Sequence, residues 1–190
     1  MNLWQDVFTS LLVSGSATII ALIIGLPLAS ICARNEFRFK RVLLTFIRAM
    51  YGLPPVVVGV AVYLMLSKQG VFSGLELLFT IQGMVIAQSL LILPLVWGVS
   101  WTSMSAIPKE VLETYRMMGV SRPEVITHLI EAKKGVSGAV MLAFGRAIAE
   151  VGAVMIVGGN IAGHTRTLTT SIDIETQQGR LEQGLLLAMV

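Results

Sequence analysis

Long uncharged stretches separated by short polar segments dominate this chain. Four of them run over residues 7–33, 49–67, 77–108 and 135–163, and only the last contains charges, Arg146 and Glu150. A helix needs about 20 apolar residues to cross about 30 Å of hydrocarbon, so each stretch is long enough to cross a bilayer once. The pattern predicts membrane-spanning helices over approximately residues 8–32, 46–67, 78–102 and 136–158.

A fifth apolar run begins near the end of the sequence. Residues 184–190 read GLLLAMV, and a helix of this length reaches only about 10 Å, which is too short to cross. We expect the start of a fifth transmembrane helix that is truncated in this chain, rather than a short anchoring stub. The predicted fold class is therefore an all-α polytopic membrane protein, a single domain over residues 1–190, with four full transmembrane helices and the start of a fifth.

Prolines and glycines inside the predicted spans indicate how the helices pack. They predict kinked or closely packed helices that face protein or a cavity rather than lipid. This pattern favours a transport role over a plain membrane anchor. The residues concerned are Pro27, Gly52, Pro54, Pro55, Pro94, Gly145 and Gly152.

Composition agrees with the membrane class and excludes several functions. Hydrophobic residues make up 55% of the chain and charged residues 13%, and the mean hydropathy is +0.80, which is atypical of a water-soluble domain. The net charge of +3 does not indicate nucleic-acid binding. The sequence contains no phosphate-binding glycine loop, metal-ligand spacing or nucleophile elbow, so we expect no catalytic residues, cofactor or metal on this chain.

Basic residues predict the orientation of the chain in the membrane. No Lys or Arg precedes Arg34, so we expect a retained first helix rather than a cleaved signal peptide. Ten of the 14 basic residues fall in alternate connections, which the positive-inside rule places in the cytoplasm, and the N-terminus then lies outside. These ten are Arg34, Arg38, Lys40, Arg41, Arg48, Lys109, Arg116, Arg122, Lys133 and Lys134.

Residues 105–135, on the predicted cytoplasmic side, have the pattern of two short amphipathic helices. Pro108 suits a first helical turn and Gly119 ends the first helix. Ser121 and Glu124 form a capping box at the start of the second helix. In one interpretation the segment is a connector on the membrane surface. In the other it is a knob that a second protein grips and through which a rigid-body movement enters the neighbouring spans.

Three segments resemble permease subunits of type I ATP-binding-cassette importers. Residues 113–132, ETYRMMGVSRPEVITHLIEA, are similar to the loop that marks these subunits: Glu113 and Gly119 match its Glu-Ala-Ala and Gly positions, and Thr114 and Tyr115 replace the alanines. The closing residues 129–132 depart from the family's Ile-x-Leu-Pro. Residues 53–66 and 145–172 resemble the oxyanion group of permeases, for tungstate, molybdate and sulfate, and are most similar to tungstate permeases.

The resemblance implies a homodimeric pore in the prokaryotic plasma or inner membrane. Its implied partners are two cytoplasmic ATPase subunits, which carry ATP and Mg, and an extracytoplasmic oxyanion-binding protein. Alternating access would be driven through the 105–135 loop, and the implied ATPase-coupling residues are Glu113, Thr114, Tyr115, Gly119, Val120 and Ser121. A molybdate or sulfate permease, a truncated non-transporting remnant, a channel and a secondary transporter remain alternatives.

Arg146 and Glu150 are the only charges between Lys134 and His164. Because a four-residue spacing puts both on one helix face, we expect an intramembrane ion pair that lowers the desolvation cost of each. We favour a structural clamp, and the alternative places Arg146 near the anion path. The hydroxyl-rich loop 159–172 offers a possible anion path or outer gate, although we favour a solvated or docking loop. Its candidate residues are Asn160, Thr165, Arg166 and Thr167.

Overall fold

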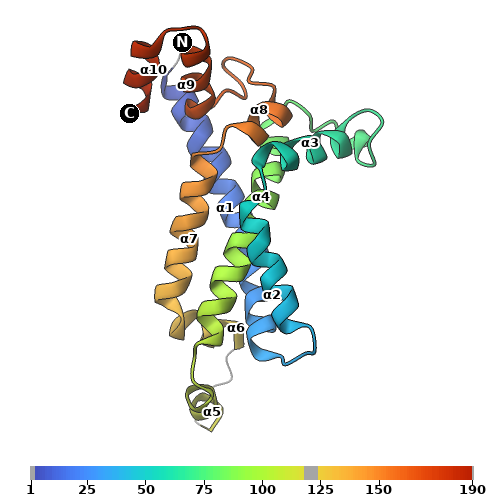
Figure 1. Ribbon diagram of the computed structural model, residues 1–190, viewed down its shortest axis with the longest axis vertical. Helices are drawn as coiled ribbons and strands as arrows, with labels where there is room; N and C mark the ends of the chain where they lie inside the picture. The colour runs from blue at the N-terminus through green and yellow to red at the C-terminus, as the bar shows by residue number, and fades with distance from the viewer. Residues whose placement is uncertain (1–2, 118–123, 190) are drawn as a thin grey trace. The chain divides into compact units, whose positions relative to one another are not determined.

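The computed structural model describes residues 3–117 and 124–189, which contain helices and no strand (Figure 1). The predicted all-α class is confirmed. Two described helices, α1 and α4, are long and apolar enough to cross a membrane, and up to four spans result if each of two bent helix pairs is one span. The elements are α1 (Leu3–Arg34), α2 (Lys40–Ala49), η1 (Met50–Gly52), α3 (Pro55–Leu66), η2 (Ser73–Leu75), α4 (Ile81–Ser105), α5 (Lys109–Met117), α6 (Glu124–Glu131), α7 (Lys133–Ile148), α8 (Gly152–Gly158), α9 (Leu168–Gln177) and α10 (Leu181–Ala188).

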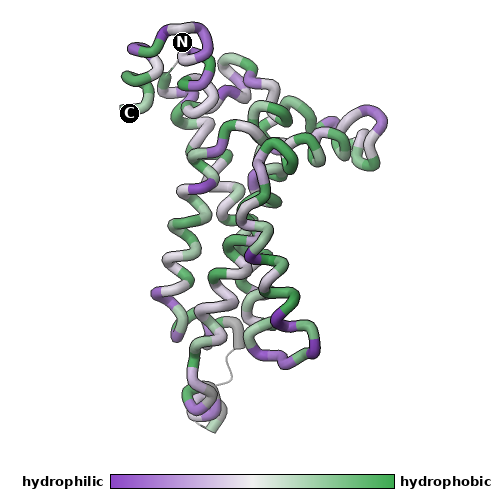
Figure 2. Tube along the Cα trace, viewed as in Figure 1, coloured by the Kyte–Doolittle hydropathy of each residue, from purple (hydrophilic) through white to green (hydrophobic). Residues whose placement is uncertain are grey.

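Figure 2 shows why the long helices suit an apolar environment. Hydrophobic residues dominate α1 and α4, whereas hydrophilic residues gather in the α1–α2 connection and on α5. Two hydroxyl side chains within α1 are satisfied locally: Thr9 donates to the carbonyl of Gln5 at 2.9 Å and Thr18 to that of Ser14 at 2.7 Å. Such bonds to the preceding turn let polar side chains sit in a helix without water.

Two of the predicted spans are broken rather than straight. The segments Lys40–Gly52 and Pro55–Leu66 are bent by 96°, and the segments Lys133–Ile148 and Gly152–Gly158 by 57°. Pro55 begins α3, where its missing N–H costs nothing, but Pro54 and Pro55 cannot continue the preceding helix. The kinks predicted from proline and glycine are therefore found at these two places. Pro27 and Pro94, by contrast, lie inside the continuous helices α1 and α4.

The chain divides into two compact units. The first consists of Met1–Thr18, Leu53–Leu91 and Phe144–Val190, and its core contains Val62, Leu66, Ala87, Ala153 and Val157. Within this unit α3 packs closely on α8: a methyl group added at Gly59 would lie 2.8 Å from the Cα of Ala153. The two broken segments therefore meet through small residues.

The polar segment that follows α8 in this first unit forms a helix that the hydrophobic pattern did not predict. Thr167 caps α9, accepting from the backbone N–H of Thr170, while the Thr170 hydroxyl accepts from the N–H of Thr167. The last helix, α10, begins at Leu181, three residues before the predicted start at 184, and packs on α9.

The second unit consists of Ile19–Gly52 and Ile92–Ala143. Its core joins the later parts of α1 and α4 to α2 and to the residue after α6, through the buried residues Ala29, Cys32, Ile47, Trp101, Met104 and Ala132, and Leu129 of α6 packs against them. In the same unit α1 packs closely on α4 at Gly25, where an added methyl group would lie 2.9 Å from Val96 Cγ1. Most of the predicted cytoplasmic residues belong to this unit.

Candidate functional site

The break between α7 and α8 separates the two charges that the sequence places four residues apart. Helix α7 ends at Ile148, so Arg146 lies on α7 and Glu150 lies beyond its end. Arg146 Nη2 donates to the carbonyl of Leu53 at 3.4 Å, and Glu150 Oε1 accepts from the N–H of Ala153 at 3.0 Å. Among the described residues these two side chains form no ion pair with each other. The predicted pair is wrong because the same-face spacing requires an unbroken helix.

Polar side chains satisfy the backbone groups that this break releases. The carboxylate of Glu150 is 6% exposed and serves the first turn of α8, while the carbonyl of Glu150 accepts from the Thr169 hydroxyl at 3.0 Å. The buried Gln88 on α4 donates through Nε2 to the carbonyl of Ala147 at 2.9 Å. Irregular backbone at membrane depth is tolerated only where such partners exist, so these contacts stabilise the bent conformation.

Arg146 is left with most of its hydrogen-bonding capacity. A guanidinium has five N–H donors, and the only hydrogen bond of this side chain among the described residues is the one to Leu53. Arg146 is neither fully buried nor fully exposed, and it lies beside the junction of two broken helices. This arrangement can attract an oxyanion by charge-assisted hydrogen bonds.

In the loop that precedes α9, the two threonines named as possible gate residues hold the backbone together. Thr165 is 1% exposed, donates to the carbonyl of Gly158 at 2.6 Å and accepts from the N–H of Ile161 at 2.9 Å. Thr167 is also buried and caps α9. Arg166 Nε donates to Asn160 Oδ1 at 3.3 Å, and both residues stay partly exposed. Of the four candidate gate residues, only Asn160 and Arg166 present polar groups to an incoming solute.

Helices α5 and α6 form where the pattern of residues 105–135 predicts two helices. The Tyr115 hydroxyl donates to Glu131 Oε1 at 2.6 Å, which joins α5 to the last residue of α6. Thr114 is exposed and donates to the carbonyl of Glu110 at 2.7 Å, and Glu113 is exposed. Gly119, Val120 and Ser121 lie outside the described residues. The charged Glu113 is therefore available to a partner at this end of the second unit.

Helix α6 is also tied to α1 by a buried contact that sequence reasoning missed. The ring Nδ1 of His128 lies 2.7 Å from Ser30 Oγ, and both side chains are buried. The two residues are 98 positions apart and share no motif, so no local signal links them. The contact makes α6 a polar link between the predicted ATPase-facing segment and the first transmembrane helix.

A second missed cluster joins the start of α1 to α9 and the loop before it. Asp6 is 3% exposed, and its Oδ2 accepts from the Ser171 hydroxyl at 2.7 Å. The Ser10 hydroxyl accepts from the N–H of Leu168 at 2.7 Å. The only sequence signal was a lone acidic residue at the start of an apolar helix. Among the described residues no three His, Cys, Asp or Glu side chains are grouped so that they could hold a metal ion.

Comparison with known proteins gives consistent matches over most of the chain. The sequence model of a family described as "Binding-protein-dependent transport system inner membrane component" matches residues 25–190. A "Probable anion ABC transporter permease protein" of Haloferax volcanii is 36% identical over 187 residues, 95% of this chain and 81% of that protein. The "Tungstate uptake system permease protein TupB" of Peptoclostridium acidaminophilum is 37% identical over 190 residues, 100% of this chain and 83% of that protein. The "Molybdenum transport system permease protein ModB" of Escherichia coli K12 is 28% identical over 178 residues, 89% of this chain and 78% of that protein.

Proposed function

Because this chain belongs to the family of inner membrane components of binding-protein-dependent transport systems, we propose that it is the permease subunit of an ATP-driven importer of a tetrahedral oxyanion. Tungstate is the proposed substrate. The observation that carries this choice is the match of the whole chain to a tungstate permease at 37% identity, whereas the molybdenum permease matches at 28%. Molybdate and sulfate are the alternatives within the same class.

Arg146 is the residue that we assign to the anion path. Its single carbonyl contact leaves donors for a passing oxyanion, and the absence of a carboxylate partner among the described residues leaves its charge available. A site that transports must bind its ion strongly enough to admit it and weakly enough to release it. One partly buried guanidinium meets this condition better than a cluster of cations, because fewer charge-assisted bonds must break on release.

The ATPase contact is assigned to α5. In this proposal a separate cytoplasmic ATPase holds ATP and Mg and receives the segment around Glu113, and an extracytoplasmic binding protein delivers the anion to a homodimer of this chain. The bonds from Tyr115 to Glu131 and from His128 to Ser30 support the assignment, because they connect α5 through α6 to α1. A displacement of α5 would then move α1 as part of one packed body.

The proposal is tested by reconstituting the chain with its ATPase and its binding protein in vesicles and measuring tungstate uptake. We expect uptake that requires both ATP and the binding protein, and co-purification of the ATPase with the permease. Uptake of molybdate or sulfate in place of tungstate, with the same ATP requirement, would change the substrate and keep the permease role. Uptake that proceeds without ATP would contradict the proposal and indicate a secondary transporter.

A further inference from the structure

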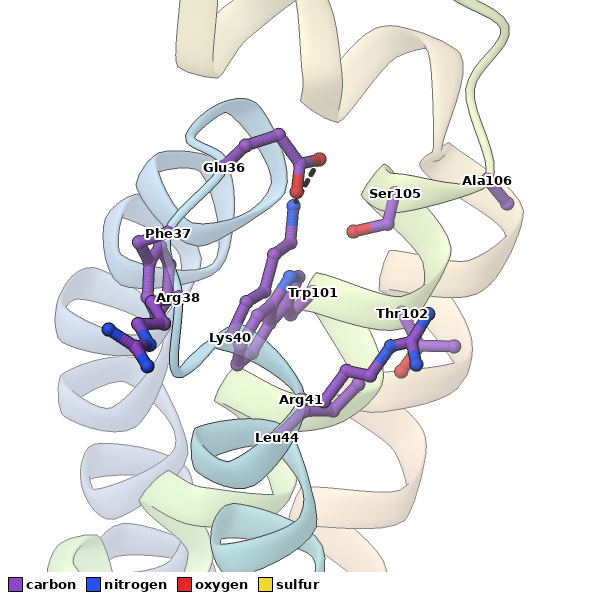
Figure 3. A pocket seen from close by; sticks show the side chains of 10 residues that line it. All are labelled: Glu36, Phe37, Arg38, Lys40, Arg41, Leu44, Trp101, Thr102, Ser105 and Ala106. Carbon is purple, nitrogen blue, oxygen red and sulfur yellow. Dashed lines mark hydrogen bonds and ion pairs between the residues drawn. The ribbon is translucent and has the colours of Figure 1, made fainter.

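A pocket of about 740 Å³ lies in the second unit, between the α1–α2 connection and the last turns of α4. Figure 3 shows its lining side chains, among them Arg38, Lys40, Arg41, Trp101, Thr102 and Ser105. The indole of Trp101 is 1% exposed, so the pocket has a buried apolar wall. Three of the residues that line it are basic and one, Glu36, is acidic.

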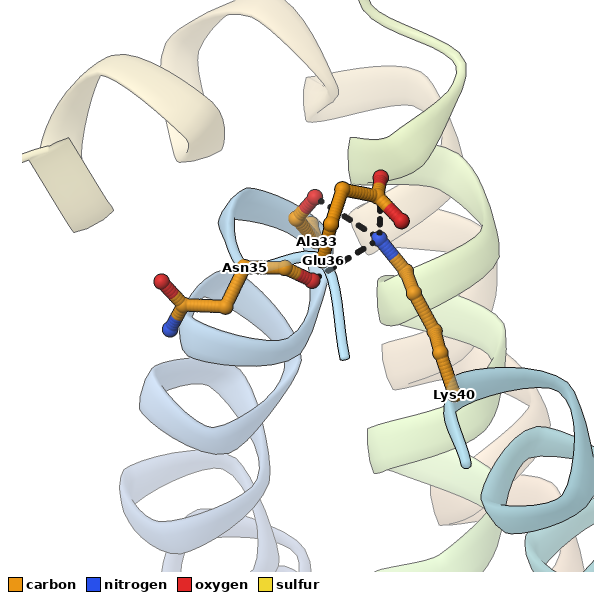
Figure 4. Close-up of polar contacts among 4 residues, drawn as sticks. All are labelled: Ala33, Asn35, Glu36 and Lys40. Carbon is orange, nitrogen blue, oxygen red and sulfur yellow. Dashed lines mark hydrogen bonds and ion pairs between the residues drawn. The ribbon is translucent and has the colours of Figure 1, made fainter. Parts of the chain in front are cut away.

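The charge of this pocket is only partly neutralised. The ammonium of Lys40 lies 3.0 Å from Glu36 Oε1 and also donates to the carbonyls of Asn35 at 3.1 Å and Ala33 at 3.4 Å (Figure 4). The charges of Lys40 and Glu36 therefore neutralise each other. Arg38 and Arg41 have no ion pair or hydrogen bond with any other described residue, and Figure 3 shows the Arg41 side chain extending beside Thr102. Two guanidinium charges are left for a ligand.

An exposed apolar stripe accompanies these two arginines. Phe39, Val42 and Phe46 are 66%, 64% and 61% exposed, and their spacing of three and four residues puts them on one side of α2. The other side of the helix is already occupied, because Leu43, Leu44 and Ile47 pack into the core of the second unit. The surface of α2 therefore combines unpaired cations with an apolar stripe, which matches a ligand that has an anionic head and a hydrocarbon tail.

We propose that this pocket binds the headgroup of an anionic phospholipid. The phosphate accepts hydrogen bonds from the Arg41 guanidinium beside Thr102. Arg38, whose side chain points away from Arg41 in Figure 3, adds positive charge at the edge of the pocket. An acyl chain lies along Phe39, Val42 and Phe46. A planar guanidinium can donate two parallel hydrogen bonds to two oxygens of a phosphate. Basic pockets beside membrane helices on the cytoplasmic side favour anionic lipids. The inference depends on the proposed function only for placing this connection at the cytoplasmic leaflet.

The test measures lipid preference directly, in phosphatidylcholine vesicles that contain the purified full chain. Spin-labelled phosphatidylglycerol or phosphatidylcholine is added at trace level, and electron paramagnetic resonance gives the fraction of each that is immobilised by the protein. We expect phosphatidylglycerol to be preferred, and the double variant R38Q/R41Q to lower that preference by roughly five-fold for each charge removed. The variant R38K/R41K is expected to keep part of the preference, because charge remains while the paired donors are lost.

The matched control is K133Q/K134Q, which removes two exposed charges on the same predicted side of the membrane, outside this pocket. It is expected to keep the wild-type preference. An unchanged preference in R38Q/R41Q, or an equal loss in the control, would overturn the proposal. Loss of immobilised lipid on addition of millimolar inorganic phosphate would assign the pocket to a free oxyanion instead. Since no ATPase or tungstate is present, failure here is distinct from failure of the transport proposal.

Discussion

Arg146 is the side chain on which the proposed anion path depends. Replacing it with glutamine keeps a donor but removes the charge, so we expect ATP-dependent tungstate uptake to fall by about ten-fold or more, the value of one charge-assisted hydrogen bond. Lysine at the same position should give an intermediate rate. Lys68→Gln removes one exposed charge from the same unit and should leave uptake unchanged. Equal uptake by R146Q and wild type, at equal amounts in the membrane, would return Arg146 to a purely structural role.

Glu175 and Arg180 predict a pH dependence near the end of the described chain. The Arg180 guanidinium, hydrogen-bonded to the carboxylate, holds the pKa of Glu175 below its usual value. A lowered pKa stabilises the folded chain above the pKa of the unfolded chain, and this contribution is lost as the pH falls through the folded value. Below about pH 4 we therefore expect faster amide hydrogen exchange in α9 and α10 than at neutral pH, beyond the intrinsic change in exchange rate. In E175Q this difference should disappear, and its persistence there would assign it to other carboxylates.

The exposed glutamates of α5 provide a matched pair for the ATPase contact. We expect Glu113→Ala to weaken stimulation of the ATPase by the permease, because Glu113 is exposed and belongs to the proposed ATPase contact. Glu110→Ala removes the same charge from an exposed position in the same helix and should keep stimulation. A bulky residue at Gly119 should resemble Glu113→Ala. ATPase rates measured in reconstituted vesicles decide this: unchanged stimulation in both the Glu113 and the Gly119 variants would contradict the assignment.

The contact between α3 and α8 predicts that Gly59 is sensitive to substitution. In Gly59→Ala the new methyl group would meet the Cα of Ala153, which as backbone cannot move aside easily, so we expect a loss of about 1–3 kcal/mol of stability. Gly15→Ala on α1 is the control, because nothing lies within 4 Å of its added methyl group. The midpoint of thermal unfolding in detergent should fall for the first variant and hold or rise for the second. Equal midpoints would show that the two helices separate more easily than their packing indicates.

Local signals predicted the helices and the presence of kinks, but not the residue at which the helix over 136–158 breaks. Helices α5 and α6 lie where proline, glycine and the residues around 121–124 predict them, because caps act over a few residues. The length and hydropathy of 136–158 predict one continuous span, because apolar residues stand on both sides of the bend. The Arg146–Glu150 pair was predicted from that unbroken helix and is therefore wrong. Helix α9 was missed because its cap uses Thr170 at the position where glutamate or glutamine is the usual signature.

The orientation of the entire chain is open to a direct test, because Cys32 is its only cysteine. In a background with Cys32→Ala, we expect Gln178→Cys to react with a membrane-impermeant maleimide in intact cells. Asn35→Cys should react only after the membrane is opened. Both positions are exposed, so accessibility within the protein does not decide the result. The reverse labelling pattern would place the N-terminus in the cytoplasm and contradict the distribution of basic residues.

Side-chain partners far apart in sequence were beyond prediction from one chain. Ser30 and His128 are 98 residues apart, and Asp6 and Ser171 are 165 apart. Each of these residues has an ordinary local context, and only the packing of the complete helices brings the partners together. The membrane class and the family followed from composition and from three segments, whereas the contacts of the candidate site required the folded arrangement.

The bond between Asp6 and Ser171 also has a consequence in time. A ribosome adds about 5–20 residues per second, so roughly 8–30 s separate the synthesis of these two residues. During that interval the first helix is already made, but the partner of its carboxylate does not yet exist. Joining two residues so far apart in sequence is also a late step in folding. The loss of chain entropy is offset only when the intervening helices have formed their contacts. The Asp6 contact therefore cannot help to orient the first helix while it enters the membrane, and it can stabilise the packed chain only afterwards.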